Sequence, residues 1–159
     1  MIYWFTGQPG HGKTVLSNHL KGYLESNYKK HVIHIDGDDI REIFQNKDYS
    51  REGRIKNITF AQNLAHFCHH KGFDVVVSVV APYKEVRDSF KERMGENMVA
   101  LYVHTTEERG REQFHVSDYE APNENYVDVD TTDESPEGSL VYIINELDIW
   151  KNLTHIFVI

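Results

Sequence analysis

The chain has 159 residues, of which 40% are apolar and 26% charged, as expected for one globular domain spanning residues 1–159. No apolar run approaches the ~20 residues that span a bilayer, the first residues carry no signal-peptide pattern, and the single cysteine, Cys68, excludes an internal disulfide. The net charge of −8, with no basic residue between Arg111 and Lys151, argues against binding of nucleic-acid polymers. We therefore expect a cytoplasmic enzyme or binding protein with no membrane partner.

Segments of strand-like and helix-like apolar spacing alternate along the chain. The pattern predicts strands over 2–5, 31–35, 75–80, 98–103 and 126–129, and helices over 13–28, 38–44, 51–71, 83–94 and 135–150. The polar stretch 104–125 is expected to form a long functional loop with one helical turn, and residues 155–159 a final strand or a tail on the sheet. Because strands alternate with helices, we expect an α/β fold with a mainly parallel sheet of about five strands.

The turn between the first strand and the first helix has the sequence GQPGHGKT and fits the pattern G-x-x-x-x-G-K-[ST]. Its glycines let successive backbone N–H groups point at phosphate oxygens, and the helix N-terminus adds a positive field. Lys13 is placed to bridge the β- and γ-phosphates, and Thr14 offers a hydroxyl to Mg²⁺. The motif predicts ATP and Mg²⁺ as cofactors and a three-layer sandwich of the P-loop NTPase type. The expected nucleotide-binding residues are Gly7, Gln8, Pro9, Gly10, His11, Gly12, Lys13 and Thr14.

Two aspartates follow the second predicted strand, in the segment Asp36-Gly37-Asp38. Ligands of doubly wound sheets bind at the carboxyl ends of the strands, so both carboxylates are expected to face the phosphate loop. One carboxylate would serve the Mg²⁺ shell with Thr14, and the other would orient or deprotonate an attacking hydroxyl. We assign Asp36 to the metal and Asp38 to the hydroxyl, with Lys13 as the third catalytic residue, although the sequence leaves the two aspartate roles interchangeable.

From the phosphate loop to about Asp130 the chain resembles the adenylylsulfate kinases. These enzymes use Mg-ATP to phosphorylate the ribose 3′-hydroxyl of adenosine 5′-phosphosulfate. The matching segments are DGDDIR at 36–41, Tyr49 followed by R-x-x-N at 54–57, VVAPYKEVR at 79–87 and DYEAPN at 118–123. The resemblance implies a small nucleotide substrate and, because the family often forms dimers, a homodimer. The residues it implies for the substrate pocket are Arg41, Tyr49, Arg54, Asn57, Val80, Ala81 and Phe114, and it implies a contact of Arg109 with ATP.

The residue chemistry agrees with that resemblance, because arginine grips phosphate or sulfate oxygens in a fork and aromatic rings stack on bases. Two departures from the family pattern leave the acceptor open: the family's lid is shortened here to residues 107–114, and Asp39 stands where the family has an asparagine. A third departure concerns the mechanism, because Ala81 stands where the family has a serine, so direct in-line transfer is expected. The leading hypothesis is transfer of the ATP γ-phosphate to adenosine 5′-phosphosulfate. The alternatives are a kinase of the same fold acting on another 5′-modified nucleotide or small hydroxyl acceptor, and a regulatory nucleotide-binding switch.

Overall fold

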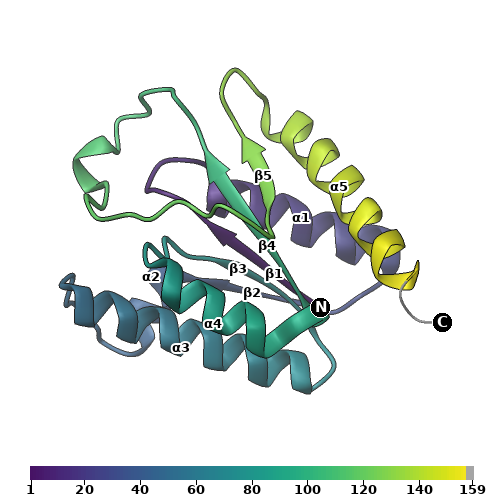
Figure 1. Cartoon of the computed structure of the whole chain (residues 1–159), viewed down its shortest axis with the longest axis horizontal. Helices are drawn as coiled ribbons and strands as arrows, with labels where there is room; N and C mark the ends of the chain where they lie inside the picture. The colour runs from purple at the N-terminus through teal and green to yellow at the C-terminus, as the bar shows by residue number, and fades with distance from the viewer. Residues whose placement is uncertain (157–159) are drawn as a thin grey trace.

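A five-stranded sheet runs through the centre of the molecule (Figure 1). The computed structural model describes the backbone of residues 1–156 and the side chains of residues 1–148. The strand order is β2-β3-β1-β4-β5, and every neighbouring pair is parallel. The strands are β1 (Ile2–Thr6), β2 (Val32–Asp36), β3 (Asp74–Ser78), β4 (Met98–His104) and β5 (Val127–Asp130).

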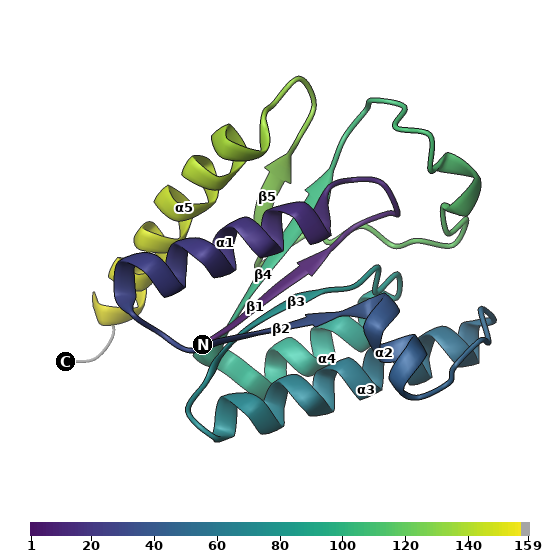
Figure 2. The same ribbon diagram turned by 180° about the vertical axis from the view of Figure 1, so that it is seen from behind.

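Helices cover both faces of this sheet, which confirms the expected three-layer α/β sandwich (Figures 1 and 2). One face carries α1 (Lys13–Tyr28) and α5 (Pro136–Ile156). The other carries α3 (Arg51–His70), α4 (Lys84–Met94) and the short α2 (Gly37–Ile43). Two 3₁₀ turns complete the elements, η1 (Gly95–Asn97) and η2 (Glu112–Phe114). No described helix is both long and apolar enough to cross a membrane.

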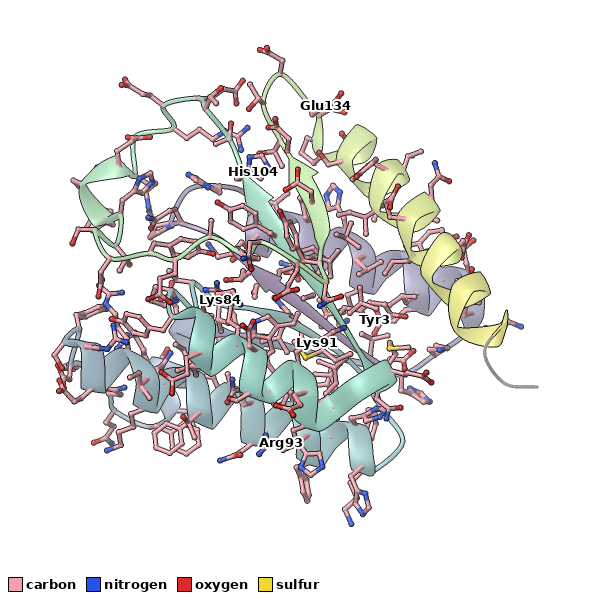
Figure 3. The ribbon with its side chains drawn as sticks, in the orientation of Figure 1. Tyr3, Lys84, Lys91, Arg93, His104 and Glu134 are labelled. Carbon is pink, nitrogen blue, oxygen red and sulfur yellow. The ribbon has the colours of Figure 1, made fainter. Side chains whose placement is uncertain are left out.

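The first four residues of the central strand β1 are apolar because both faces of the strand are covered by helices. Ile2 and Trp4 pack into the core under α3 and α4, whereas Tyr3 and Phe5 pack into the core under α1 and α5. Tyr3 lies between the sheet and those two helices (Figure 3). All four side chains are at most 1% exposed. A strand buried on both faces favours apolar side chains at successive positions, as is usual in parallel sheets.

The structure differs from the sequence expectation at two ends of elements. The last helix continues to Ile156, so a strand beginning at His155 was a wrong prediction, and residues 157–159 lie outside the described residues. No proline or glycine follows Gly138 to stop the helix. The third strand ends at Ser78 instead of residue 80. Beyond Ser78 the chain leaves the sheet. The Thr6 hydroxyl donates to the Val80 carbonyl (2.7 Å), and Ala81 takes a positive φ of 43°.

Candidate active site

A cleft of about 740 Å³ opens at the carboxyl ends of the strands. The phosphate loop, α2 and the loop that carries η2 lie at this end of the sheet (Figure 1). The structure brings most of the expected site residues together on its walls. These are Pro9, Gly10, Lys13, Thr14, Asp36, Asp38, Arg41, Tyr49, Arg54, Asn57, Val80, Ala81 and Phe114. The expected residues that do not line it are Gly7, Gln8, His11, Gly12 and Arg109.

The phosphate loop takes a conformation that requires its first glycine. A Cβ on Gly7 would lie 2.1 Å from the Val103 carbonyl oxygen, so no other residue fits there. Lys13 folds back over the loop and donates from Nζ to the Gln8 carbonyl (2.8 Å). Burial lowers the pKa of Lys13 to about 8, opposed by the carboxylates of Asp36 and Asp38. The ammonium group is therefore charged at neutral pH and held at the cleft wall, where a phosphate would neutralise it.

Three hydrogen bonds fix the carboxylate of Asp36. Its Oδ2 accepts from the hydroxyls of Thr14 (2.9 Å) and Ser78 (2.6 Å). Its Oδ1 accepts from the Asp38 amide (2.9 Å), so the Asp36 side chain also caps the N-terminus of α2. The hydroxyl oxygen of Thr14 and the carboxylate oxygens of Asp36 are hard donors of the kind that Mg²⁺ prefers. These two residues therefore fit the Mg²⁺ of a bound nucleotide.

A half-buried histidine contacts the residues that hold this pair. His34 Nε2 lies 2.9 Å from Ser78 Oγ and 3.0 Å from Ser17 Oγ. Ser78 gives its proton to Asp36 and Ser17 gives its proton to the Thr14 carbonyl, so Nε2 must carry the ring proton and donate. Burial lowers the pKa of His34, which keeps the ring neutral. The sequence analysis missed His34 and Ser78, although both are polar residues near the carboxyl ends of neighbouring strands.

Asp38 differs from Asp36 although both follow the same strand. Its side chain is exposed, lines the cleft and makes no hydrogen bond within the described part of the chain. Its charge opposes the lowering of the pKa of Lys13, and both residues line the cleft. An unengaged carboxylate beside the phosphate loop is free to accept a hydrogen bond from a substrate hydroxyl.

Cations and an aromatic ring form the wall contributed by α2 and α3. The guanidinium of Arg41 covers one face of Tyr49, 4.2 Å from the ring centroid, and its Nη1 donates to the carbonyls of Asn46 and Asp48. Arg54 donates from Nε to the Tyr49 carbonyl (2.9 Å), and its terminal nitrogens make no hydrogen bond among the described residues. Tyr49 is 61% exposed, so its ring keeps surface for a ligand. Arg54 is thus the better placed of the two arginines to bind an anion.

The wall formed by α2 and α3 also contains a buried amide, and η2 contributes an exposed ring. Asn57 Nδ2 donates to the Gly37 carbonyl (3.1 Å), and its buried Oδ1 has no partner within the described chain. An unpaired buried acceptor costs free energy unless a ligand supplies a donor. Phe114 is 56% exposed at the end of η2, and the cleft is also lined by Arg111 and Gln113, which the sequence analysis did not single out.

Two residues assigned to ATP make other contacts. Arg109 pairs with Glu107 (2.5 Å) and donates to the Thr131 carbonyl (2.7 Å), so its guanidinium is held beside the phosphate loop near Gly12. The ring of His11 packs edge-on against His115. Burial, followed by the charge of His115, lowers the pKa of His11 to about 4. His11 is therefore neutral at physiological pH and adds no positive charge to the loop.

Arg87 is a further residue that the sequence analysis left without a role. It is 6% exposed and donates from Nη1 to the Ala81 carbonyl (2.6 Å) and from Nη2 to the Glu120 carbonyl. These bonds fasten α4 to the turn after β3, which lines the cleft, and to the chain around Glu120. The sequence feature that could have indicated a role for Arg87 is its position at the end of the segment VVAPYKEVR, which matches the family pattern.

Comparison with known proteins gives a consistent result. The adenylylsulphate kinase family model matches residues 1–138. A cytidine diphosphoramidate kinase of Campylobacter jejuni is 30% identical over 144 residues, which cover 88% of this chain and 84% of that protein. An adenylyl-sulfate kinase of Pseudomonas aeruginosa is 30% identical over 167 residues, covering 92% and 85%. The APS kinase of Mycobacterium tuberculosis, solved with AMPPNP and APS, superposes with a TM-score of 0.79 at 18% identity, over 92% of this chain and 96% of that one. This chain belongs to the adenylylsulphate kinase family.

Proposed function

We propose that this protein is an ATP-dependent kinase that phosphorylates a ribose hydroxyl of a nucleotide carrying an acidic anhydride at its 5′ end. One observation carries the proposal. A single cleft is lined by the phosphate loop, by two aspartates with different surroundings, and by a set of cationic, amide and aromatic side chains suited to a second nucleotide. Its volume of about 740 Å³ is in the range of small-molecule sites.

The donor side of the proposed reaction is built from the phosphate loop. The backbone amides from Gly7 to Thr14 bind the phosphates of ATP, and Lys13 neutralises charge on the β- and γ-phosphates. Thr14 and Asp36 would hold Mg²⁺, which offsets negative charge on the phosphates when it is bound. Hydrogen bonds from Ser78 and from the Asp38 amide keep the Asp36 carboxylate in one orientation, so little reorganisation is needed on binding.

The acceptor side lies along α2, α3 and the loop that carries η2. Asp38 accepts the hydrogen bond of the attacking hydroxyl and orients it toward the γ-phosphate. Arg54 binds the anionic 5′ end with its terminal nitrogens, and Asn57 Oδ1 receives a donor from the acceptor nucleotide. Tyr49 and Phe114 provide exposed rings for the base. Because Ala81 has no hydroxyl, the phosphoryl group passes directly from ATP to the acceptor.

Two acceptors fit this chemistry. Adenosine 5′-phosphosulfate, phosphorylated on its 3′-hydroxyl, is favoured by membership of the family. Cytidine diphosphoramidate is favoured by the relative from Campylobacter jejuni, which matches 88% of this chain. Both carry a 5′ anhydride, so both need the positive charge of Arg54 for the anionic 5′ end. Their bases differ, so each base would contact the rings of Tyr49 and Phe114 in its own way. The contact surface of these two rings is therefore expected to decide between them.

The test is ADP release from Mg-ATP in the presence of each acceptor, with Lys13→Ala as the control. We expect one of the two nucleotides to stimulate ADP release at least tenfold, and the stimulation to vanish in Lys13→Ala. Mass analysis of the product would identify the phosphorylated nucleotide. Binding of ATP without stimulation by either acceptor would contradict the proposal and favour a nucleotide-binding switch.

A further inference from the structure

The loop of residues 105–118 lies directly against the phosphate loop instead of standing apart from it. A Cβ on Gly10 would lie 2.8 Å from Cβ of Arg111, and the rings of His11 and His115 are 5.2 Å apart in an edge-on arrangement. His115 Nε2 donates to the Pro9 carbonyl (3.1 Å). The two segments are more than 90 residues apart in the sequence, yet they form one wall of the cleft.

The strongest link between them is made by the side chain of Gln8. Its Nε2 donates to the Val116 carbonyl (2.9 Å), and its Oε1 accepts from the Val116 amide (2.8 Å). This closed pair of hydrogen bonds, the Gln8 clamp, imitates the pairing of two strands. Val116 is 5% exposed, so its amide would be buried without a partner if the side chain of Gln8 were absent, whereas its carbonyl would keep the bond from the Tyr119 amide (3.2 Å). The backbone carbonyl of Gln8 therefore accepts a hydrogen bond from Lys13, while the side chain of Gln8 bonds to Val116 of the loop.

Phe114 depends on this fastening because little else holds it. Its ring is 56% exposed, and the guanidinium of Arg111, on the same loop, lies 5.4 Å from its centroid. The hydrogen bonds at His115 and Val116 follow directly after it in the chain. The position of the Phe114 ring is thus tied to the phosphate loop through the two residues that follow it in the chain.

We propose that Gln8 is a positioning residue that holds Phe114 against the acceptor nucleotide and so couples the acceptor site to the phosphate loop. The inference rests on the proposed function, in which Phe114 contacts the acceptor base. In a P-loop motif the backbone N–H groups of the loop bind the phosphates, which leaves the side chain after the first glycine available for another contact. Here the side chain of Gln8 does not line the cleft and bonds to the loop that carries Phe114.

The experiment compares Gln8→Met, Phe114→Ala and the double variant in steady-state kinetics with adenosine 5′-phosphosulfate and with cytidine diphosphoramidate. Methionine keeps the length of the side chain and removes both hydrogen bonds. We expect Gln8→Met to raise the KM of the acceptor about tenfold and to leave the Kd of ATP within threefold. Since Gln8 acts through Phe114, the double variant should be no worse than Phe114→Ala alone.

A second measurement reports on the clamp without any turnover. The Val116 amide should be protected from hydrogen exchange in the wild-type protein and should exchange at least tenfold faster in Gln8→Met. Asn63→Leu is the matched control, because it replaces an exposed amide on α3 by an apolar side chain, and it should change neither the kinetics nor the exchange of Val116.

The outcomes separate this inference from the proposed function. An unchanged acceptor KM in Gln8→Met, or fully additive effects in the double variant, would overturn the positioning role while the kinase activity stands. Equal exchange of the Val116 amide in the two proteins would overturn the clamp itself. If the wild-type protein phosphorylates neither acceptor, the proposed function fails, and the exchange measurement still decides whether Gln8 holds the loop.

Discussion

Asp36 and Asp38 are two residues apart, yet their surroundings are opposite. The carboxylate of Asp36 accepts three hydrogen bonds, whereas that of Asp38 is exposed and accepts none within the described chain. The sequence alone left their roles interchangeable. Hydrogen bonds from Thr14 and from Ser78, on the neighbouring strand β3, support the proposed assignment of Asp36 to the metal and Asp38 to the hydroxyl, because a carboxylate held in one orientation suits a metal and a free one suits proton transfer.

We expect Asp38→Asn to lower kcat by about 10²–10⁴, the usual contribution of a general base, and to leave ATP binding within threefold. Turnover would be followed by ADP release, and ATP binding by calorimetry. Asp39→Asn is the matched control, because Asp39 is an exposed neighbour that does not line the cleft. A kcat in Asp38→Asn close to that of Asp39→Asn would contradict the assignment.

A second prediction at this scale concerns the proton on Lys13. Burial lowers the pKa of this side chain to about 8 in the free protein, and bound phosphates should raise it because they favour the charged ammonium. Between the two pKa values ATP binding must take up a proton, about half a proton per site at pH 8. Calorimetry in two buffers with different ionisation enthalpies measures this uptake. Lys13→Arg, which stays charged throughout, should show none.

At the scale of elements, the turn after β3 shows how the cleft wall is held. Ala81 lies there with a positive φ, and its carbonyl accepts from Arg87 of α4 and, at 3.3 Å, from the hydroxyl of Thr6. Glu120 joins the same arrangement, because its amide donates to the Pro82 carbonyl (2.9 Å) and its own carbonyl accepts from Arg87. One buried arginine thus ties α4, the turn and the far end of the active-site loop together.

Replacing this arginine should weaken both the fold and the site. We expect Arg87→Met to lower the free energy of unfolding by about 2–4 kcal/mol, because the buried Ala81 carbonyl and the part-buried Glu120 carbonyl lose a charged donor. The acceptor KM should rise as well, since Ala81 lines the cleft. Urea denaturation measures the first effect. Arg93→Met, an exposed position on the same helix, should cost less than about 1 kcal/mol, and an equal loss in the two variants would refute the argument.

The elements also show what sequence reasoning recovers and what it misses. The phosphate loop and Asp36 were predicted because short motifs fix local backbone geometry next to a strand end. Gln8–Val116 and Arg87–Glu120 were not, since these partners are 108 and 33 residues apart and pair through backbone groups that every sequence offers. Ser78 and His34 were not predicted as site residues for a related reason. Their hydrogen bonds to one another and to Asp36 form only when β2 and β3 lie side by side in register.

At the scale of the whole molecule, the site occupies one end of the sheet and the helical layers stabilise it from both faces. Ile143 of α5 is fully buried in the core shared with α1. We expect Ile143→Ala to cost about 2–5 kcal/mol of unfolding free energy and to leave the Kd of ATP unchanged, because α5 does not line the cleft. Val141→Ala, at a position 59% exposed on the same helix, should be nearly neutral. An altered ATP affinity in Ile143→Ala would show that α5 shapes the site.

The central place of β1 has a consequence for how the chain is made. Residues 2–5 pair with residues 75–78 on one side, and residues 2–6 pair with residues 98–102 on the other. During synthesis β1 therefore leaves the ribosome before either partner strand, and at least one side of its run of Ile2, Tyr3, Trp4 and Phe5 stays unpaired until β4 has also emerged. Chaperones that recognise short apolar segments can bind the strand in this interval, so the yield of active protein in a cell should depend on how long translation takes to pass from β1 to β4.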